Sequence, residues 1–336
     1  MKNEIKSIGI DVSKNTLDIC ILEDNNSKEK YMKIENNYQG ISGLVRKLKN
    51  CKFDKQTLPL VFESTGDYHI LLGVILRESG LNACIINPLI TKRFNASNIR
   101  KIKTDKQDSK TLAQIGLQNK ECLDKFIGER EDIILKKKLS VLHTIATKMR
   151  AMKASINSLK EVHKSLDTQE DEDIERLEET FNLFRKSVKS LEGEIVKYIV
   201  NKKEVQSRSR IKGVSEKTAS VIGIHIKDKK FENKRQLIAF TGLDVSVCES
   251  GMMKRKGKLS KRGNAQLRST VVQCAWGLKM HNESFNKLYE YHKKQGKHYY
   301  TCLIILARKL LSVIFGMLKN GSEYDSELVK KELSYC

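Results

Sequence analysis

Two short apolar runs near the start of the chain each end in a carboxylate. Residues 8–10 lead directly into Asp11, and residues 60–62 lead directly into Glu63. Short apolar runs of this kind, bounded by polar residues, are typical of buried strands. The pattern therefore predicts a sheet that carries carboxylates at the ends of two of its strands.

A second pair of carboxylates follows later, in Lys103-Thr104-Asp105-Lys106-Gln107-Asp108. Residues three apart share one face of a helix, so Asp105 and Asp108 are expected to point the same way. Carboxylates are the hard oxygen ligands that Mg²⁺ or Mn²⁺ prefers, and in two-metal phosphodiester chemistry a central carboxylate bridges both ions. Asp11 suits the bridging position and Glu63 a flanking one. Solvated surface acids are the alternative, since the chain has 41 Asp and Glu residues.

The first 120 residues have an α/β pattern. The expected strands are residues 8–11, 17–22, 31–34, 59–63 and 83–86, and the expected helices are residues 38–49, 68–78 and 105 to about 118. Three strands, a helix, and then alternating strand and helix match the order of the ribonuclease H fold. We therefore expect a ribonuclease H-like domain over residues 1–125.

Residues 130–200 differ in kind, because they contain no proline and only one glycine, Gly193. Apolar residues recur from Leu135 to Ile156, and again at alternating steps of three and four from Ile174 to Tyr198. This spacing predicts a helical hairpin or coiled coil over residues 126–203. The seam can be buried within one chain or between two copies.

Residues 204–325 are expected to form a third, mostly helical domain. Helices are expected at residues 231–240, 264–280 and 299–318, with an exposed basic loop over residues 241–258. The run Ile211–Ala219 is typical of a tight glycine turn that opens a helix. Such turns in helix-hairpin-helix modules direct backbone N–H groups at a DNA phosphate. An ordinary capped helix is an equal alternative.

The charge balance indicates a polyanionic partner. Net charge is +22, from 63 Lys and Arg against 41 Asp and Glu, and the excess is concentrated. No acidic residue lies between Glu78 and Asp105, or between Gly251 and Asn282. A soluble basic protein without such a partner is the alternative. The candidate nucleic-acid contacts are Lys92, Arg93, Arg100, Lys103, Lys254, Arg255, Lys256, Lys258, Lys261, Arg262 and Arg268.

The eight cysteines include no C-x-x-C pair, so no zinc site is expected. With no signal peptide evident, scattered cysteines favour a reducing cytoplasm. The apolar run at residues 302–307 is too short to span a bilayer. A cytoplasmic, nucleoid-associated protein is therefore expected.

Three N-terminal segments resemble the motifs of the DEDD transposases, which are insertion-sequence recombinases of the IS110 family related to Piv-type DNA invertases. They are Ile8-Gly9-Ile10-Asp11-Val12-Ser13-Lys14, Phe62-Glu63-Ser64-Thr65-Gly66 and the segment from Lys103 to Asp108. C-terminal segments are similar too, namely Thr241-Gly242-Leu243, Glu249-Ser250-Gly251, Gly257-Lys258-Leu259-Ser260-Lys261-Arg262-Gly263-Asn264 and Leu267-Arg268. Family members more often show Ser-Ser-Gly-Gly where this chain has Glu249-Ser250-Gly251-Met252.

The resemblance implies a RuvC-like domain with Asp11, Glu63, Asp105 and Asp108 as its acidic quartet. It also implies a nucleophilic serine in the C-terminal domain that is assembled with the acidic site of another subunit. Ser250 occupies the family's Ser-Gly stretch, and Ser260 is the rival, with a helix N-cap or a phosphate contact as its other interpretation. The implied partners are donor and target DNA, a structured bridge RNA, and further copies of the chain in a dimer or tetramer.

Three functions remain open at this point. The chain can be an RNA-guided DNA recombinase that forms a phosphoserine intermediate. It can be a RuvC-like metal-dependent nuclease that cuts specific DNA structures and stops. It can also be a nucleic-acid-binding scaffold without catalysis. The serine loop separates the first from the second, because a metal-dependent nuclease needs no serine nucleophile.

Overall fold

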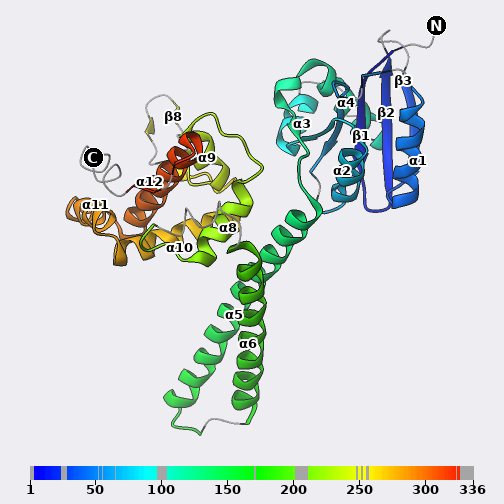
Figure 1. The fold of residues 1–336 in the computed structure, drawn as a ribbon. Coiled ribbons are helices and arrows are strands. Elements are labelled where there is room, and N and C mark those ends of the chain that lie inside the picture. Colours follow the sequence, from blue (N-terminus) through cyan, green and yellow to red (C-terminus); the bar gives the residue numbers. More distant parts are fainter. Residues whose placement is uncertain are drawn as a thin grey trace. The chain divides into compact units, whose positions relative to one another are not determined.

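The computed structural model divides the chain into two compact units, Met1–Arg130 and Glu131–Cys336 (Figure 1). The residues described are 4–23, 29–51, 53–54, 56–64, 66–96, 104–169, 172–200, 211–246, 249–250, 253–254, 257–322 and 324–325.

The first unit is built on a six-stranded mixed sheet with the order β3-β2-β1-β4-β5-β6. Its strands are β1 (Ile5–Val12), β2 (Thr16–Glu23), β3 (Glu29–Glu35), β4 (Leu60–Glu63), β5 (Ala83–Ile86) and β6 (Asp124–Lys125). The first three strands are antiparallel, β4 and β5 run parallel to β1 and to each other, and β6 is antiparallel to β5. This arrangement confirms the ribonuclease H-like order expected from the sequence.

Helices cover both faces of this sheet. They are α1 (Tyr38–Lys49), α2 (His69–Glu78), α3 (Pro88–Ala96), α4 (Asp105–Gln118) and the short 3₁₀ turn η1 (Lys120–Cys122). Helix α2 lies on the face of Phe62, whose ring centroid is 6.3 Å from that of His69. Because side chains alternate along a strand, the neighbouring residue Val61 faces the other side, where it contacts α4. The buried positions of α1 are those that its 3.6-residue spacing predicts.

Helix α4 lies on β1 with almost no side chain between the two backbones. A Cβ atom on Gly9 would lie 2.1 Å from the carbonyl oxygen of Ser109 and 2.2 Å from the amide nitrogen of Ala113. A Cβ on Gly116 would lie 2.5 Å from Ser7 Oγ. Ser109, Ala113 and Gly116 therefore form a small-residue stripe at helical spacing that lets the helix approach the strand closely.

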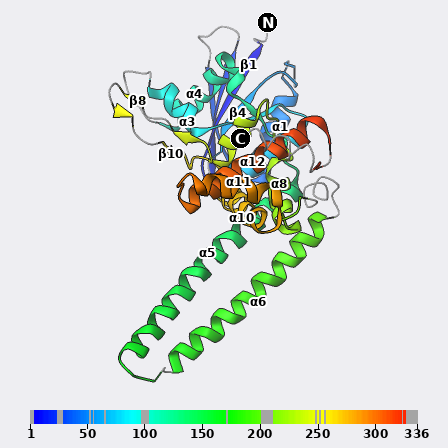
Figure 2. The same ribbon diagram turned by 90° about the vertical axis from the view of Figure 1, so that its left-hand side faces the viewer.

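The second unit begins with two long helices, α5 (Arg130–Ser165) and α6 (Glu172–Val200), which form a hairpin (Figure 2). Near its tip Lys160 pairs with Glu178 at 3.2 Å. The predicted apolar seam of α6 is buried at Ile174 and Ile195 and half-buried at Phe181 and Val188. Exposed apolar residues of α6 in that interval are Leu177, Leu183, Phe184 and Leu191.

The base of the hairpin is fixed to the helices that follow. Asp132, only 1% exposed, accepts a 2.7 Å hydrogen bond from Lys227, and Lys136 pairs with Asp228 at 2.9 Å. On α6, Glu192 pairs with Lys217 at 2.7 Å. A buried carboxylate needs such a partner, since an unpaired buried charge is strongly destabilising. The predicted separation of residues 126–203 from residues 204–325 as distinct domains stays a prediction.

Within the described part of the chain, the helices that follow the hairpin and form most of the C-terminal core are α8 (Glu216–Ile226), α9 (Lys234–Thr241), α10 (Ala265–His281), α11 (Glu283–Lys294) and α12 (Tyr299–Asn320). Helix α12 is long and apolar enough to cross a membrane by length and composition. Its buried residues, from Cys302 to Met317, belong to this core, and α12 packs against α9, α10 and α11. Core packing therefore accounts for its apolar composition. The sequence reasoning did not identify α11, which is short and has a largely charged exposed face.

The segment expected to be an exposed loop, residues 241–258, contains short ladders instead. Strand β7 (Val245–Ser246) pairs with β10 (Lys258–Leu259), and β8 (Glu249–Ser250) pairs with β9 (Met253–Lys254), both antiparallel. Strands of two residues are too short to show a period of two in the sequence, which explains why a loop was expected.

The contact at Gly9 gives a first test. Gly9→Ala places a methyl group inside the α4 backbone, and overpacking of this kind destabilises by about 1–3 kcal/mol. Gly43→Ala is the matched control, because Gly43 lies within α1 with nothing within 4 Å of the added Cβ. We expect it to be neutral or to stabilise by up to about 1 kcal/mol. Urea unfolding followed by circular dichroism measures both, and equal midpoints would contradict the proposed contact.

Candidate active site

Two carboxylates of the predicted quartet lie at the ends of adjacent parallel strands. In the β1–β4 ladder Ile10 is in register with Phe62. Asp11 and Glu63 each follow one residue later, so both lie at the carboxyl end of the paired segment. The structure thus brings these two residues to the same edge of the sheet, as their positions after apolar runs predict.

The other two carboxylates are carried by the first turn of α4. Thr104 caps this helix by accepting a 3.2 Å hydrogen bond from the Gln107 amide, and Asp105 and Asp108 follow in the first turn. Negative side chains at a helix N-terminus are stabilised by the helix dipole. The predicted helix from Asp105 to about Gln118 is confirmed.

The Gly9 contact directs this first turn towards Asp11. Helix α4 runs antiparallel to β1, because Gly116 contacts Ser7 whereas the earlier helix residue Ser109 contacts the later strand residue Gly9. Gly9 and Asp11 share one face of the strand, because side chains alternate. Continuing in the same direction by one helical turn brings the start of α4 to the level of Asp11.

The pKa of Asp11 shows that the other three carboxylates of the quartet interact electrostatically with it. Partial burial is the largest cause that raises its pKa, and the like charges of Asp108, Asp105, Asp18 and Glu63 raise it further, to about 6. Each of these charges disfavours a second negative charge nearby. The three other predicted carboxylates thus all act on Asp11, together with one that sequence reasoning missed.

The missed carboxylate is Asp18, which is directly opposite Asp11 in the antiparallel β1–β2 ladder. It is 1% exposed, accepts a hydrogen bond from the Tyr31 hydroxyl and pairs with Lys33 at 3.3 Å. Lys33 also lies 3.9 Å from Asp105, so it links the buried acid to the quartet. The signal was an acid inside the apolar run Leu17–Leu22, where a charge requires a partner.

A closed metal site is not formed as the side chains stand. Among the residues that the structure describes, no group of three Asp, Glu, His or Cys side chains lies close enough to hold a metal ion. Asp105 contacts Lys33 at 3.9 Å, and the like charges of the quartet raise the pKa of Asp11. The donor set fits Mg²⁺ or Mn²⁺, because it consists of hard oxygen ligands whose repulsion a divalent cation would relieve.

The two candidate serines lie on the short ladders of the second unit. Ser250 is in β8, in register with Met253 of β9, and the structure describes the backbone there. Ser260 follows β10 and closes the base of this segment. Its hydroxyl donates a hydrogen bond to the Asp244 carboxylate, and its amide donates to the Asp244 carbonyl at 2.9 Å.

The suggestion that Ser260 caps a helix is wrong. Helix α10 begins at Ala265, and its N-cap is Asn264, whose side chain accepts a 2.9 Å hydrogen bond from the Leu267 amide. Ser260 lies too early to reach the first turn of α10. Between them Lys261 has a positive φ of 54°, which non-glycine residues rarely adopt, so surrounding contacts hold this turn in place.

The predicted nucleic-acid contacts divide into three groups. Lys92, Arg93, Lys258, Lys261 and Arg262 are exposed. Arg268 is half-buried and donates 3.3 Å hydrogen bonds to the carbonyls of Thr241 and Gly263, so it stabilises the turn before α10. Arg100, Lys103, Arg255 and Lys256 lie outside the described residues, and Lys254 is described by its backbone. Contacts with nucleic acid stay predictions for all of them.

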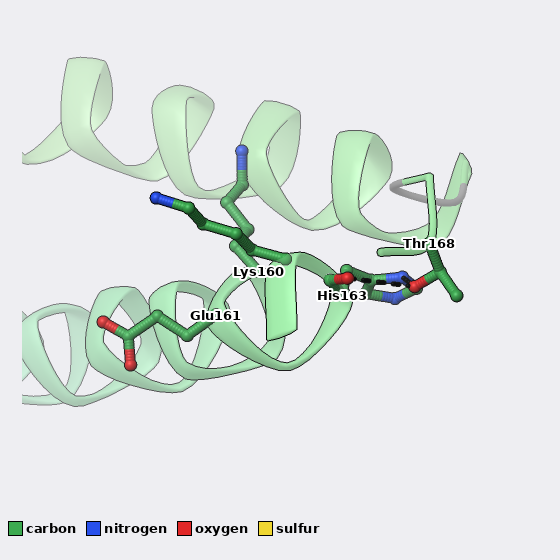
Figure 3. A pocket seen from close by; sticks show the side chains of 5 residues that line it. Lys160, Glu161, His163 and Thr168 are labelled. Atoms are coloured by element: carbon green, nitrogen blue, oxygen red, sulfur yellow. Dashed lines mark hydrogen bonds between the residues drawn. The ribbon is translucent and has the colours of Figure 1, made fainter. Parts of the chain in front are cut away.

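A hollow at the tip of the helical hairpin has different chemistry. It has a volume of about 320 Å³, and its lining includes Lys160, Glu161, His163 and Lys164 (Figure 3). His163 Nδ1 lies 2.9 Å from the hydroxyl oxygen of Thr168, which closes the turn after α5. Among the described residues that line this hollow, Glu161 supplies the one carboxylate and Lys160 and Lys164 supply two cations.

Comparisons with known proteins cover most of the chain. Residues 8–164 match a DEDD transposase family of the IS110 type, and residues 208–290 match the transposase IS116/IS110/IS902 family. The chain is 24% identical to the pilin gene-inverting proteins of Moraxella bovis and Moraxella lacunata over 331 residues, which is 96% of this chain and 98% of each relative. It is 27% identical over 117 residues to the 43.6 kDa protein of insertion element IS110 of Streptomyces coelicolor, covering 34% of this chain and 29% of that protein.

The raised pKa of Asp11 predicts a pH-dependent stability in metal-free buffer. Because the folded-state pKa of Asp11 lies above its unfolded value, the bound proton stabilises the fold below about pH 4. That contribution is lost as the pH rises through about 6. Asp11→Asn should therefore raise the free energy of unfolding at pH 7.5 by about 1 kcal/mol, after allowance for solvent screening of a partly exposed group.

Asp18→Asn is the matched control on the facing strand. It removes the charge that Lys33 and Tyr31 contact. Breaking a fully buried ion pair costs about 3–5 kcal/mol, which is an upper limit here because Lys33 is half-exposed. We expect this variant to be less stable than the natural chain at pH 7.5. Thermal unfolding from pH 4.5 to 7.5 in a chelator distinguishes the two, and an Asp11→Asn variant that loses stability at pH 7.5 contradicts the electrostatic assignment.

Proposed function

This chain belongs to the IS110 family of DEDD transposases, and from that membership we propose that it exchanges DNA strands through a serine nucleophile under RNA guidance. The observation that carries the catalytic part of the proposal is the raised pKa of Asp11 and the carboxylates that cause it. Glu63 comes from one sequence segment and Asp105 and Asp108 from another, both distant from Asp11, yet all three raise the pKa of the Asp11 carboxyl group on a ribonuclease H-like sheet.

The acidic quartet would hold the divalent metal that the DEDD family implies. Asp11, Glu63, Asp105 and Asp108 supply carboxylate oxygens, and Mg²⁺ or Mn²⁺ bound there would stabilise negative charge on a reacting phosphate. Asp18 is not a member of the proposed ligand set, because it is buried against Lys33 and Tyr31. Its part is to hold Lys33, which in turn contacts Asp105.

The proposed nucleophile is Ser250, in the segment that resembles the family's Ser-Gly stretch. Its oxygen would form one phosphate ester bond while the bond from phosphorus to one DNA oxygen breaks. A hydroxyl of the partner DNA strand would then attack the phosphoserine, which restores Ser250 and joins the strands. The proton that Ser250 loses is balanced by the proton that the leaving DNA oxygen gains, so no other reactant is required. Lysine and arginine residues following Ser250 would stabilise the charged phosphate.

The proposed partners are donor and target DNA and a structured guide RNA that pairs with both. The support is the acid-free run between Gly251 and Asn282, which holds eight Lys and Arg residues. Phosphate neutralisation by such residues supplies affinity without reading sequence. Base pairing by the RNA would then supply the choice of site. A cytoplasmic location follows from the same proposal and stays a prediction.

A homo-oligomer is proposed because a family-like site combines the acidic quartet of one subunit with Ser250 of another. The support within this chain is the open part of the α6 seam. Phe184 is 53% exposed and Leu191 is 47% exposed, although both belong to an uninterrupted three-and-four pattern. Apolar side chains at heptad spacing that are not covered by their own chain are typical of helices that pair with a second copy.

The nucleophile can be identified by trapping the covalent intermediate. With element-end DNA, the associated RNA and Mg²⁺, the natural chain should recombine and form a protein–DNA adduct. Asp11→Ala should lose both activities by about a thousandfold or more, since removal of a catalytic group costs factors of that order. Ser250→Ala should lose the adduct, whereas Ser246→Ala, on the neighbouring ladder, should keep it.

The rival assignments give different results in the same assay. If Ser260 were the nucleophile, Ser260→Ala would abolish the adduct and Ser250→Ala would retain it. If the chain were a metal-dependent nuclease, Ser250→Ala would still cut DNA and no adduct would form. Recombination that survives complete ribonuclease digestion would remove the RNA from the proposal.

The oligomer has its own test in Phe184→Ser. Replacing an exposed phenylalanine by serine should shift the mass in solution from a multiple of 38.5 kDa towards the single chain, because the apolar contact between copies is lost. Asn182→Ser, two residues earlier and also exposed, is the control and should leave the mass unchanged. Light scattering measures both. A natural chain that is monomeric at micromolar concentration excludes a stable seam between copies.

A further inference from the structure

An open cleft lies between α8 and α10 in the second unit, and neither the acidic quartet nor the candidate serines are among its described lining residues. Its volume is about 380 Å³. One wall is the turn Gly213–Ser215 with Thr218 behind it, and the other wall is the face of α10 that carries Gln273, Trp276 and His281. A volume of this size lies within the range of small-ligand sites, about 300–1,000 Å³.

Two facing glycines bring these walls together. A Cβ on Gly213 would lie 2.7 Å from the carbonyl oxygen of Gly277, and a Cβ on Gly277 would lie 2.3 Å from the carbonyl oxygen of Gly213. Gly213 also has a φ of +99°, which side chains other than glycine's rarely adopt. The backbones of the turn and of α10 therefore touch beside the cleft, which fixes the separation of its two walls.

Trp276 is the only tryptophan of the chain, and it is 51% exposed within this cleft. Its neighbours Ala275 and Leu278 are fully buried, so the helix is firmly packed while the indole ring remains open. A large aromatic ring left open on a rigid helix is typical of a surface that stacks against a flat ligand. Gln273 and His281 provide donors and acceptors at the rim.

The described residues that line the cleft include no acidic side chain. Lys212 precedes the glycine turn and Glu216 follows it, so the preference for a polyanion comes from the net charge of +22 of the whole chain. An aromatic platform with polar rim groups on a strongly basic chain is the combination that holds unpaired bases of a polynucleotide.

We infer that the Trp276 cleft binds an unpaired nucleobase of a single-stranded polynucleotide, with the base stacked on the indole ring. This inference rests on the proposed nucleic-acid substrates, and it names a contact separate from both the acidic quartet and Ser250. A base in a duplex is already stacked on both faces, so the cleft selects unpaired segments. Stacking is tolerant of sequence, because every base has a flat face.

The single tryptophan makes the cleft directly observable. Titration with fifteen-nucleotide oligo-dT, oligo-U and a blunt duplex of the same length is followed by intrinsic fluorescence and by anisotropy of a label on the nucleic acid. Both single strands should quench Trp276 as they bind, and the duplex should bind without quenching. A larger effect of oligo-U than of oligo-dT assigns the cleft to RNA, and the reverse assigns it to DNA.

Variants of Trp276 test base stacking by anisotropy of the labelled nucleic acid, without tryptophan fluorescence. Trp276→Ala should weaken single-strand binding about tenfold, since stacking on one aromatic ring contributes that order of affinity. Trp276→Phe should recover most of the loss. Met280→Ala, one turn further along α10 and 56% exposed, should bind like the natural chain. Duplex binding should change in none of the three, and matching thermal midpoints verify that each variant is folded.

The possible failures are distinct. Single strands that bind by anisotropy without quenching Trp276 overturn the cleft and leave the proposed function intact. A chain that binds no nucleic acid overturns both. Fluorescence that changes with protein concentration alone assigns the cleft to contact with a second copy, and this result also overturns the inference.

Discussion

The direct contact between α4 and β1 at Gly9 is the constraint on which the acidic site depends. Carboxylates on a strand and on a helix can act together only if the two elements are held at a fixed separation. An ordinary side chain at position 9 would separate them, since its Cβ would overlap the backbone of residues 109 and 113. The same stripe of small residues along α4 repeats the contact at Gly116. The packing of α4 on β1 and the proximity of the four carboxylates therefore depend on the same pair of elements.

Repulsion between the carboxylates opposes the arrangement that this packing imposes. Five carboxylates share the region around the end of β1, and burial together with like charge raises the pKa of Asp11 to about 6. Lys33 offsets part of the repulsion by contacting both Asp18 and Asp105. A cation bound among these carboxylates would reduce their mutual repulsion. Lys33 does so in part, and a divalent ion at the quartet would compete with it for Asp105.

Much of this site is predictable from the sequence, because its signals are local. Apolar runs that end in Asp11 and Glu63, and the Thr104 cap followed by Asp105, each fit within a few residues. Asp18 is also visible as an acid within an apolar strand, but its role depends on the register that sets it opposite Asp11. The two-residue ladders around Ser250 have no period to detect, and the hydrogen bond from Ser260 to Asp244 joins residues that only the fold brings together. Long-range pairing is what the sequence does not reveal.

The segment from Asp244 to Ser260, which carries Ser250, is closed at its base, and this has a consequence for changes in its length. Ser260 donates one side-chain and one backbone hydrogen bond to Asp244, and the Lys261 amide donates a further hydrogen bond to the Gly242 carbonyl. The entropy of closing a loop grows slowly with its length. Insertions or deletions between the two ends are therefore expected to leave α9 and α10 undisturbed, whereas the proposed chemistry limits them to changes that keep Ser250 in position.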